Sequence, residues 1–314
     1  MKLSTPISLQ SPDSLYTYGS NFLNLGSCFA SNLANKLDYF GFTSLQNPIG
    51  VLFHPFAINQ FCKWLDNESI DEKLFVKDQG IWKSMQAHSC MQGETSEELL
   101  HVLQDAVEST RNYLAKTDAV FITFGTAFSY QHLFSSKYVA NCQKQNASLF
   151  DKKLMGIQAL IEAINETIQI LSKHTKAKIY FSLSPVRHLK DGLVENNLSK
   201  AHLLAAIHQV VEQHKVVSYL PAYEFVLDEL RDYRFYDRDL LHPNQLAIDF
   251  VWEKFSVAYF DELTKQVMKK VDKFKRLSAH RPMQKNKALH LAHFAKLESH
   301  KEELLALEPK LKLD

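Results

Sequence analysis

Short apolar runs alternate with longer amphipathic stretches along most of the chain. Three of these runs end at a glycine or a proline: FLNLG at Gly26, AVFITFG at Gly125, and KIYFSLSP at Pro185. All three are rich in aromatic and β-branched residues, which is typical of buried parallel strands. A weaker run, KVVSYLP, covers residues 215–221. The pattern predicts four strands whose C-terminal ends carry the chemistry.

The stretches between these runs have the spacing of amphipathic helices. Residues 95–116 begin with Thr95 and Glu98, the arrangement of a capping box, and continue with apolar residues at helical intervals. Residues 154–174 and 199–214 show the same spacing. Strands alternating with helices favour an α/β fold with a parallel sheet and helices on both faces, and such sheets bind ligands at the carboxyl ends of their strands.

The last part of the chain has a different pattern. No glycine follows Gly192, and from Asn244 onward the sequence is typical of helices. We expect one α/β domain over residues 1–263 and a helical C-terminal extension over residues 264–314, rich in Lys and His. A solvated extension is favoured over a role in binding nucleic acid or a partner. The apolar positions expected to pack it onto the domain are Val267, Val271, Phe274, Leu289 and Phe294.

The composition is that of a soluble globular protein. The 314 residues are 46% hydrophobic, and 36 basic residues nearly balance 35 acidic ones for a net charge of +1. Such a balance provides no overall field that would attract nucleic acid or an anionic membrane. No stretch approaches the roughly 18 apolar residues of a membrane span, and the N-terminus lacks the apolar segment of a signal peptide. We therefore expect a cytoplasmic protein and leave its oligomeric state open.

The cysteines and histidines give no metal signature. The four cysteines lie far apart without C-x-x-C spacing, and the 14 histidines include no H-E-x-x-H motif. A chain of this length has little need of disulfides, so we expect reduced thiols. Neither a metal nor another cofactor is expected.

The turn after Gly26 places two potential nucleophiles, Ser27 and Cys28, at the start of a predicted helix. Free N–H groups at a helix N-terminus favour an anion, so a thiol there is expected to have a lowered pKa. A hydroxyl would need an adjacent base. The alternative is structural: Ser27 caps the helix and Cys28 is a small buried residue.

A possible base lies more than 200 residues further along the chain. In DLLHP, His242 follows Asp239 by three residues, a spacing that no other histidine shares. One loop can then carry an imidazole and the carboxylate that orients it, as in a nucleophile, His and Asp triad. The aromatic-rich segment over residues 223–239 is expected to brace this loop.

Taken together, these segments resemble the GSCFA domain family, a branch similar to the SGNH (GDSL-type) hydrolases. The resemblance is carried by LGSCFA (residues 25–30), NPIGVLFHP (47–55), ITFGTAFSY (122–130), VANCQK (139–144), SPVRHLKDGLVENNLSKAHL (184–203) and RDYRFYDRDLLHPN (231–244). It implies a three-layer α/β/α sandwich.

The resemblance also implies site residues. Aligned on Gly26, Cys28 stands where the SGNH pattern has its nucleophilic serine, with Ser27 as the alternative; His242 would be the general base and acid, and Asp239 would orient it. The family's oxyanion hole combines backbone N–H groups with a glycine, for which Gly50 is the candidate, and an asparagine. Ala127 stands at the asparagine position, so Asn141 is the candidate replacement.

Further polar residues follow the predicted strands. Arg187 and His188 come after the third strand, where an arginine could hold a substrate carboxylate or phosphate or could tie down its own loop through Asp191 or Glu195. His54 and His88 are additional pocket candidates, and for each a structural hydrogen-bonded histidine is the alternative.

The sequence therefore favours a hydrolase or acyltransferase that acts on an acyl ester or thioester through a covalent acyl intermediate. The substrate would be a small molecule, glycan or lipid carrying an acyl group. The alternative is an inactive SGNH-like domain that binds an acylated or glycosylated ligand or a protein partner, because the G-D-S aspartate and the asparagine are absent.

Overall fold

The structure is a computed structural model that describes residues 4–279 and 287–313, and the side chains of all but residues 287–292 among these. Five parallel strands form its central sheet in the order β11-β10-β6-β1-β2. They are β1 (Asn21–Gly26), β2 (Thr43–Gln46), β6 (Ala119–Phe124), β10 (Lys178–Leu183) and β11 (Val217–Tyr219). The four predicted strands are present, and β2 is one that the sequence did not predict.

The two faces of the sheet form two separate apolar cores, because neighbouring residues in a strand point to opposite faces. In β6, Val120, Ile122 and Phe124 belong to one core and Phe121 to the other. Residues of both sets are buried. The sequence of such a strand is therefore an almost continuous apolar run. Apolar and polar residues do not alternate along it, because both of its faces are buried.

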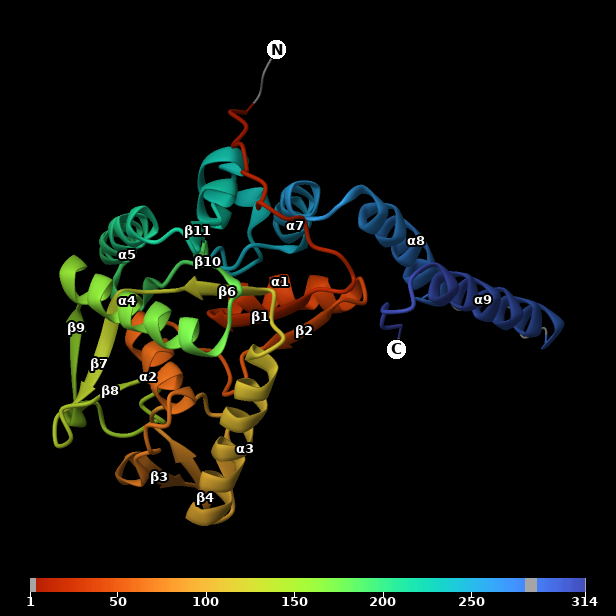
Figure 1. The fold of residues 1–314 in the computed structure, drawn as a ribbon. Coiled ribbons are helices and arrows are strands. Elements are labelled where there is room, and N and C mark those ends of the chain that lie inside the picture. The colour runs from red at the N-terminus through yellow and green to blue at the C-terminus, as the bar shows by residue number, and fades with distance from the viewer. Residues whose placement is uncertain (1–3, 280–286, 314) are drawn as a thin grey trace.

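Helices cover both faces, which makes the fold a three-layer α/β/α sandwich as expected (Figure 1). One face packs against α2 (Pro55–Leu65), α3 (Ser96–Leu114), α4 (Ile157–His174) and α5 (Leu193–Gln213). The other packs against α1 (Cys28–Tyr39), the short α6 (Ala222–Glu224) and α7 (Gln245–Tyr259). The capping box of α3 is confirmed in part: Thr95 Oγ1 accepts from the N–H of Glu98 at 3.1 Å, whereas the Glu98 carboxylate accepts from the N–H of Glu94.

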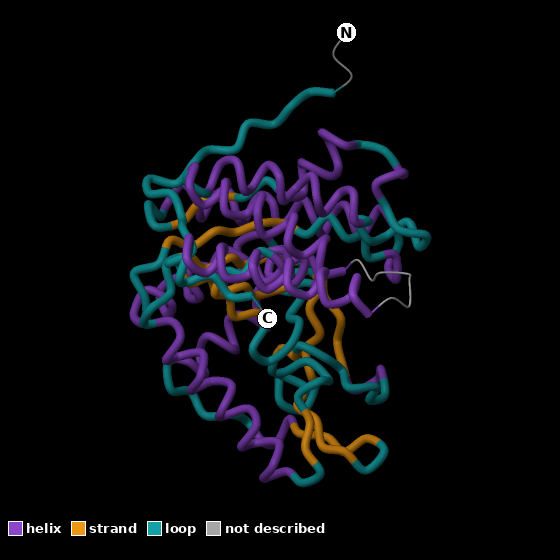
Figure 2. Tube along the Cα trace, turned by 90° about the vertical axis from the view of Figure 1, so that its right-hand side faces the viewer, coloured by secondary structure: helices purple, strands orange, loops and turns teal. Residues whose placement is uncertain are grey.

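Two small antiparallel sheets were not predicted. One contains β3 (Phe75–Asp78), β4 (Ile81–Ser84) and β5 (Gln92–Gly93), and the other contains β7 (Phe128–His132), β8 (Tyr138–Val139) and β9 (Phe150–Leu154). Figure 2 shows strands lying beyond the layered part of the molecule. The strands of the two small sheets have two to five residues and are only partly buried. Their apolar pattern is therefore too short to recognise in the sequence.

The C-terminal helices α8 (Glu262–Ala279) and α9 (Lys287–Leu307) extend away from the sheet (Figure 1). The predicted packing of Val267, Val271 and Phe274 is confirmed, since all three are buried in the same core as α7. For Phe294 the prediction is wrong, because the residue is 60% exposed. The side chain of Leu289 lies outside those described. The boundary at residue 263 stays a prediction.

Candidate active site at the carboxyl edge of the sheet

The turn after β1 is very tightly packed. Gly26 has φ +123°, and a Cβ at this position would lie 2.2 Å from the carbonyl oxygen of Thr123 on β6. Only glycine combines this backbone conformation with such a close approach. The N–H of Ser27 donates to the same oxygen at 2.9 Å. The turn is therefore fixed to the end of β6.

Ser27 caps α1. Its Oγ accepts a hydrogen bond from the N–H of Phe29 at 3.3 Å, and the residue is only 2% exposed. This is the structural role that the sequence left open for Ser27. Cys28, the first residue of α1, is exposed.

The expected lowering of the Cys28 pKa is wrong. Burial of its surroundings raises the pKa of the thiol, and the opposing effect of its own backbone N–H is smaller. Although the residue retains exposed surface, water near the sulfur is reduced enough to disfavour the thiolate. At neutral pH Cys28 is therefore a thiol, and it would need a base to become a nucleophile.

His242 and Asp239 form a hydrogen-bonded pair. The Nδ1 of His242 lies 2.7 Å from Asp239 Oδ2, while Asp239 Oδ1 accepts from the N–H groups of His242 and Leu241. These bonds, that of the His242 N–H first, lower the pKa of Asp239 to about 2. The carboxylate is thus ionised at neutral pH, and its bond to Nδ1 leaves Nε2 of His242 as the proton acceptor.

Arg187 connects this loop to the end of β10. Its N–H donates to the carbonyl of Leu241 at 3.1 Å. Its guanidinium lies over the rings of Tyr236 and Tyr233, with 4.4 and 4.9 Å between its central carbon and the ring centroids. Arg187 and the aromatic segment thus brace the loop that carries His242. The salt bridge of Asp191 is with Lys152.

The segment that contains Gly50 runs beside the Gly26 turn. The side chain of Asn47 accepts from the N–H of Gly26 at 2.8 Å, and the N–H of Leu52 donates to the carbonyl of Gly26 at 3.0 Å. The N–H of Gly50 donates to the carbonyl of Asn47 at 2.7 Å. Gly50 thus lies between two residues that are bonded to Gly26, but a bond within its own turn already uses its N–H.

His54 is a buried cap of α2. Its Nδ1 accepts from the N–H of Ala57 at 3.2 Å, and its Nε2 lies 3.0 Å from the carbonyl of Val139. Burial lowers the pKa of His54 to about 4. Both ring nitrogens are used within the protein, so neither is open to a ligand. One ring nitrogen of His88 is also used within the protein, because its Nδ1 accepts from the N–H of Cys90.

Asn141 lies on a neighbouring loop. Its N–H donates to the carbonyl of Met85, and its Oδ1 accepts from the N–H of Gln143 at 2.8 Å. The segment containing Met85 leads to His88, whose N–H donates to the carbonyl of Ile49 beside Gly50. Asn141 and Gly50 are thus connected through one intervening segment, and the Asn141 side chain takes part in a local turn.

His188 lies against the loop after β6. A Cβ on Gly125 would be 3.4 Å from His188 Nε2 and 3.5 Å from the Cβ of Ser27. Nε2 is buried and has no hydrogen-bond partner among the described residues. Burial first, then the charges of Lys200 and His242, lower the pKa of His188 to about 4. A neutral imidazole thus borders the Gly26 turn.

Lys200 is a residue that the sequence analysis missed. It is 3% exposed, and its Nζ donates to the carbonyls of Gly125 and Ser184, each at 2.6 Å. Burial lowers its pKa to about 7. A signal was present, because Lys200 is in helical phase with the buried Leu203 and Ile207 of α5. A lysine in an apolar stripe indicates a buried amine.

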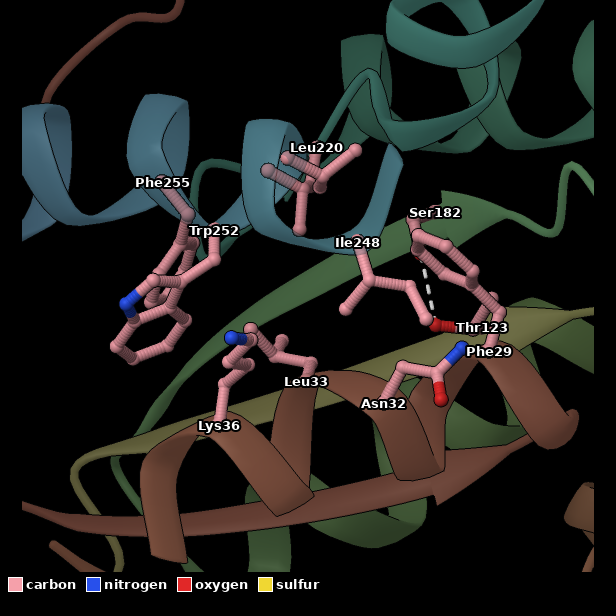
Figure 3. Close-up of a pocket in the computed structure, with 11 residues that line it drawn as sticks. Phe29, Asn32, Leu33, Lys36, Thr123, Ser182, Leu220, Ile248, Trp252 and Phe255 are labelled. Atoms are coloured by element: carbon pink, nitrogen blue, oxygen red, sulfur yellow. Dashed lines mark hydrogen bonds between the residues drawn. The ribbon is translucent and has the colours of Figure 1, made fainter. Parts of the chain in front are cut away.

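A small cavity of about 20 Å³ lies behind the turn, between α1 and α7 (Figure 3). Thr123 and Ser182 line it, and their hydroxyl groups are hydrogen-bonded with 2.8 Å between the oxygens. Such a volume holds about one water molecule. It is too small for an organic ligand.

A comparison with protein families gives a match to the model described as GSCFA family over residues 21–255. The chain belongs to the GSCFA family. No curated protein matches the sequence. The GSCFA match includes the whole central sheet and every candidate site residue, and it ends within α7, so α8 and α9 lie outside it.

Two further findings concern the described parts of the GSCFA chain. None of the helices in the described parts of the chain has the length and apolar composition needed to cross a membrane. Over the same residues, no three His, Cys, Asp or Glu side chains gather where they could hold a metal ion.

Proposed function

We propose that this GSCFA protein is an SGNH-like hydrolase or acyltransferase that transfers an acyl group from an ester or thioester through Cys28. The observation that carries the proposal is the pair of His242 and Asp239, with 2.7 Å between Nδ1 and Oδ2. The loop of this pair is bonded to Arg187, in the loop that follows β10, at the edge where the Gly26 turn also lies.

The raised pKa of Cys28 fits general-base catalysis. His242 Nε2 takes the thiol proton while the sulfur attacks the acyl carbon, and the Asp239 carboxylate stabilises the resulting imidazolium. His242 then returns the proton to the leaving alcohol or thiol. Water completes hydrolysis of the acyl-cysteine, or an acceptor alcohol completes transfer.

A second candidate function is binding of an acylated ligand without turnover. The protonated thiol of Cys28 and the occupied N–H of Gly50 favour it. Turnover separates the two functions, since a binding protein would retain the ester intact.

The test is hydrolysis of p-nitrophenyl acetate and of a short acyl thioester. Cys28→Ala and His242→Ala are expected to abolish turnover, whereas Ser27→Ala is expected to retain it with a stability loss of about 1 kcal/mol from the missing cap. His101→Ala is the control, because this exposed histidine lies on α3. Turnover that survives loss of His242 contradicts the mechanism, and a wild-type protein inactive on both probes favours the binding function.

A further inference from the structure

The carboxyl edge holds a polar atom that the mechanism above does not use. Nε2 of His188 is buried and unpartnered among the described residues. A buried polar group without a hydrogen bond destabilises the folded protein, so a fold retains such an atom more readily when a ligand supplies the partner. Its position beside Gly125 and Ser27 puts it next to the Gly26 turn.

Several contacts fix the position of His188. Its N–H donates to Asn196 Oδ1 at 2.9 Å, and the ring of Phe53 meets its ring edge to face at 6.1 Å between centroids. Nearby, Lys200 donates to the carbonyls of Gly125 and Ser184, the residues that directly follow β6 and β10. The ring is therefore held by α5 and by the segment that follows Gly50.

We propose that His188 Nε2–H is the side-chain donor to the acyl oxygen in the transition state. This inference rests on the proposed function and supplies the donor that Ala127 cannot provide. When the sulfur of Cys28 bonds to the acyl carbon, the π-electron pair of the carbonyl moves to oxygen, and His188 donates a hydrogen bond to that oxyanion without transferring its proton. The pair returns as the bond to the leaving oxygen or sulfur breaks.

The charges around His188 suit a neutral donor. Lys200 and His242 both disfavour a second proton on its ring, as does burial, and Asp191 has a smaller opposite effect. Lys152 also lowers the pKa. His188 is therefore neutral at neutral pH and acts only as a hydrogen-bond donor, whereas His242 takes up and returns the thiol proton in the proposed mechanism.

Kinetics of His188 variants test the proposal with p-nitrophenyl acetate. His188→Leu is expected to lower kcat about 100- to 1,000-fold with little change in KM, as for loss of an oxyanion donor. His188→Gln, which keeps an N–H donor, should retain more of the rate. An unchanged kcat in His188→Leu overturns the inference, and it leaves the proposed function intact if Cys28→Ala and His242→Ala remain inactive.

Two measurements keep the inference testable if His188→Leu fails to fold. Gly125→Ala would add a methyl group 3.2 Å from the carbonyl oxygen of Phe53 and 3.4 Å from His188 Nε2, at a residue without a left-handed backbone, and it should lower kcat; its circular-dichroism spectrum shows whether the fold is kept. Nitrogen NMR of the wild-type protein should find His188 neutral between pH 5 and 8 with its hydrogen on Nε2. A hydrogen on Nδ1 contradicts the proposal.

Discussion

Lys200→Met tests how the protein holds the loops at its carboxyl edge. The wild-type ammonium is buried and donates to two backbone carbonyls, those of Gly125 and Ser184. No salt bridge to a carboxylate is found for it among the described residues. Methionine has a similar length but no charge and no hydrogen-bond donor. The substitution therefore removes the titratable amine while the new side chain fills the volume that the lysine side chain occupied.

The magnitude follows from the pKa. Burial lowers the pKa of Lys200 from 10.5 to about 7. Between these values the unfolded chain binds more protons than the native protein, so the free energy of unfolding rises with pH. Since one pKa unit corresponds to about 1.4 kcal/mol, the rise from pH 7 to pH 9 should be about 2 kcal/mol for this group.

Urea unfolding at pH 7 and pH 9 measures this effect. The difference in unfolding free energy between the two pH values should be about 2 kcal/mol larger in wild type than in Lys200→Met. Lys176→Met, at an exposed lysine, is the control and should behave like wild type. An identical pH dependence in Lys200→Met and wild type would refute the reasoning, because it would mean that Lys200 keeps its charge in the folded protein.

Three further predictions concern the turn, the cap and the thiols. Gly26→Ala should unfold at markedly lower temperature, since the added Cβ would lie 2.2 Å from the carbonyl oxygen of Thr123; an unchanged melting temperature would contradict the tight turn. Burial lowers the pKa of His54 from 6.5 to about 4, so the free energy of unfolding should fall by about 3 kcal/mol as the pH falls from 6.5 to 4. His54→Asn should lose this pH dependence. An equal acid sensitivity in both proteins would show another cause. Iodoacetamide at pH 7 should modify exposed Cys90 faster than Cys28, whose thiol pKa is raised; peptide mass spectrometry checks the order, and faster modification of Cys28 would indicate a thiolate.

The sequence predicts the central sheet better than its surroundings. β1, β6 and β10 are recognisable because burial on both faces gives nearly continuous apolar runs. The small antiparallel sheets escape prediction because their strands are short and half-buried. The packing of α8 was predictable from its apolar stripe, whereas the exposure of Phe294 depends on where α9 lies in space.

The candidate site was predictable only where it is local in sequence. The three-residue spacing of Asp239 and His242 is sufficient for their hydrogen bond. The pKa of Cys28 depends instead on burial by distant segments, which outweighs the effect of the helix N-terminus. The bonds of Lys200 to Gly125 and Ser184 likewise depend on how α5 packs across two loops.

Trapping the acyl intermediate tests the central claim most directly. Wild-type protein mixed with p-nitrophenyl acetate is quenched in acid within the first turnover, and the peptide that contains Ser27 and Cys28 is sequenced by mass spectrometry. The account predicts an acetyl group on the sulfur of Cys28 and none in His242→Gln. An acetyl group on Ser27, or one that forms at the same rate without His242, would contradict it.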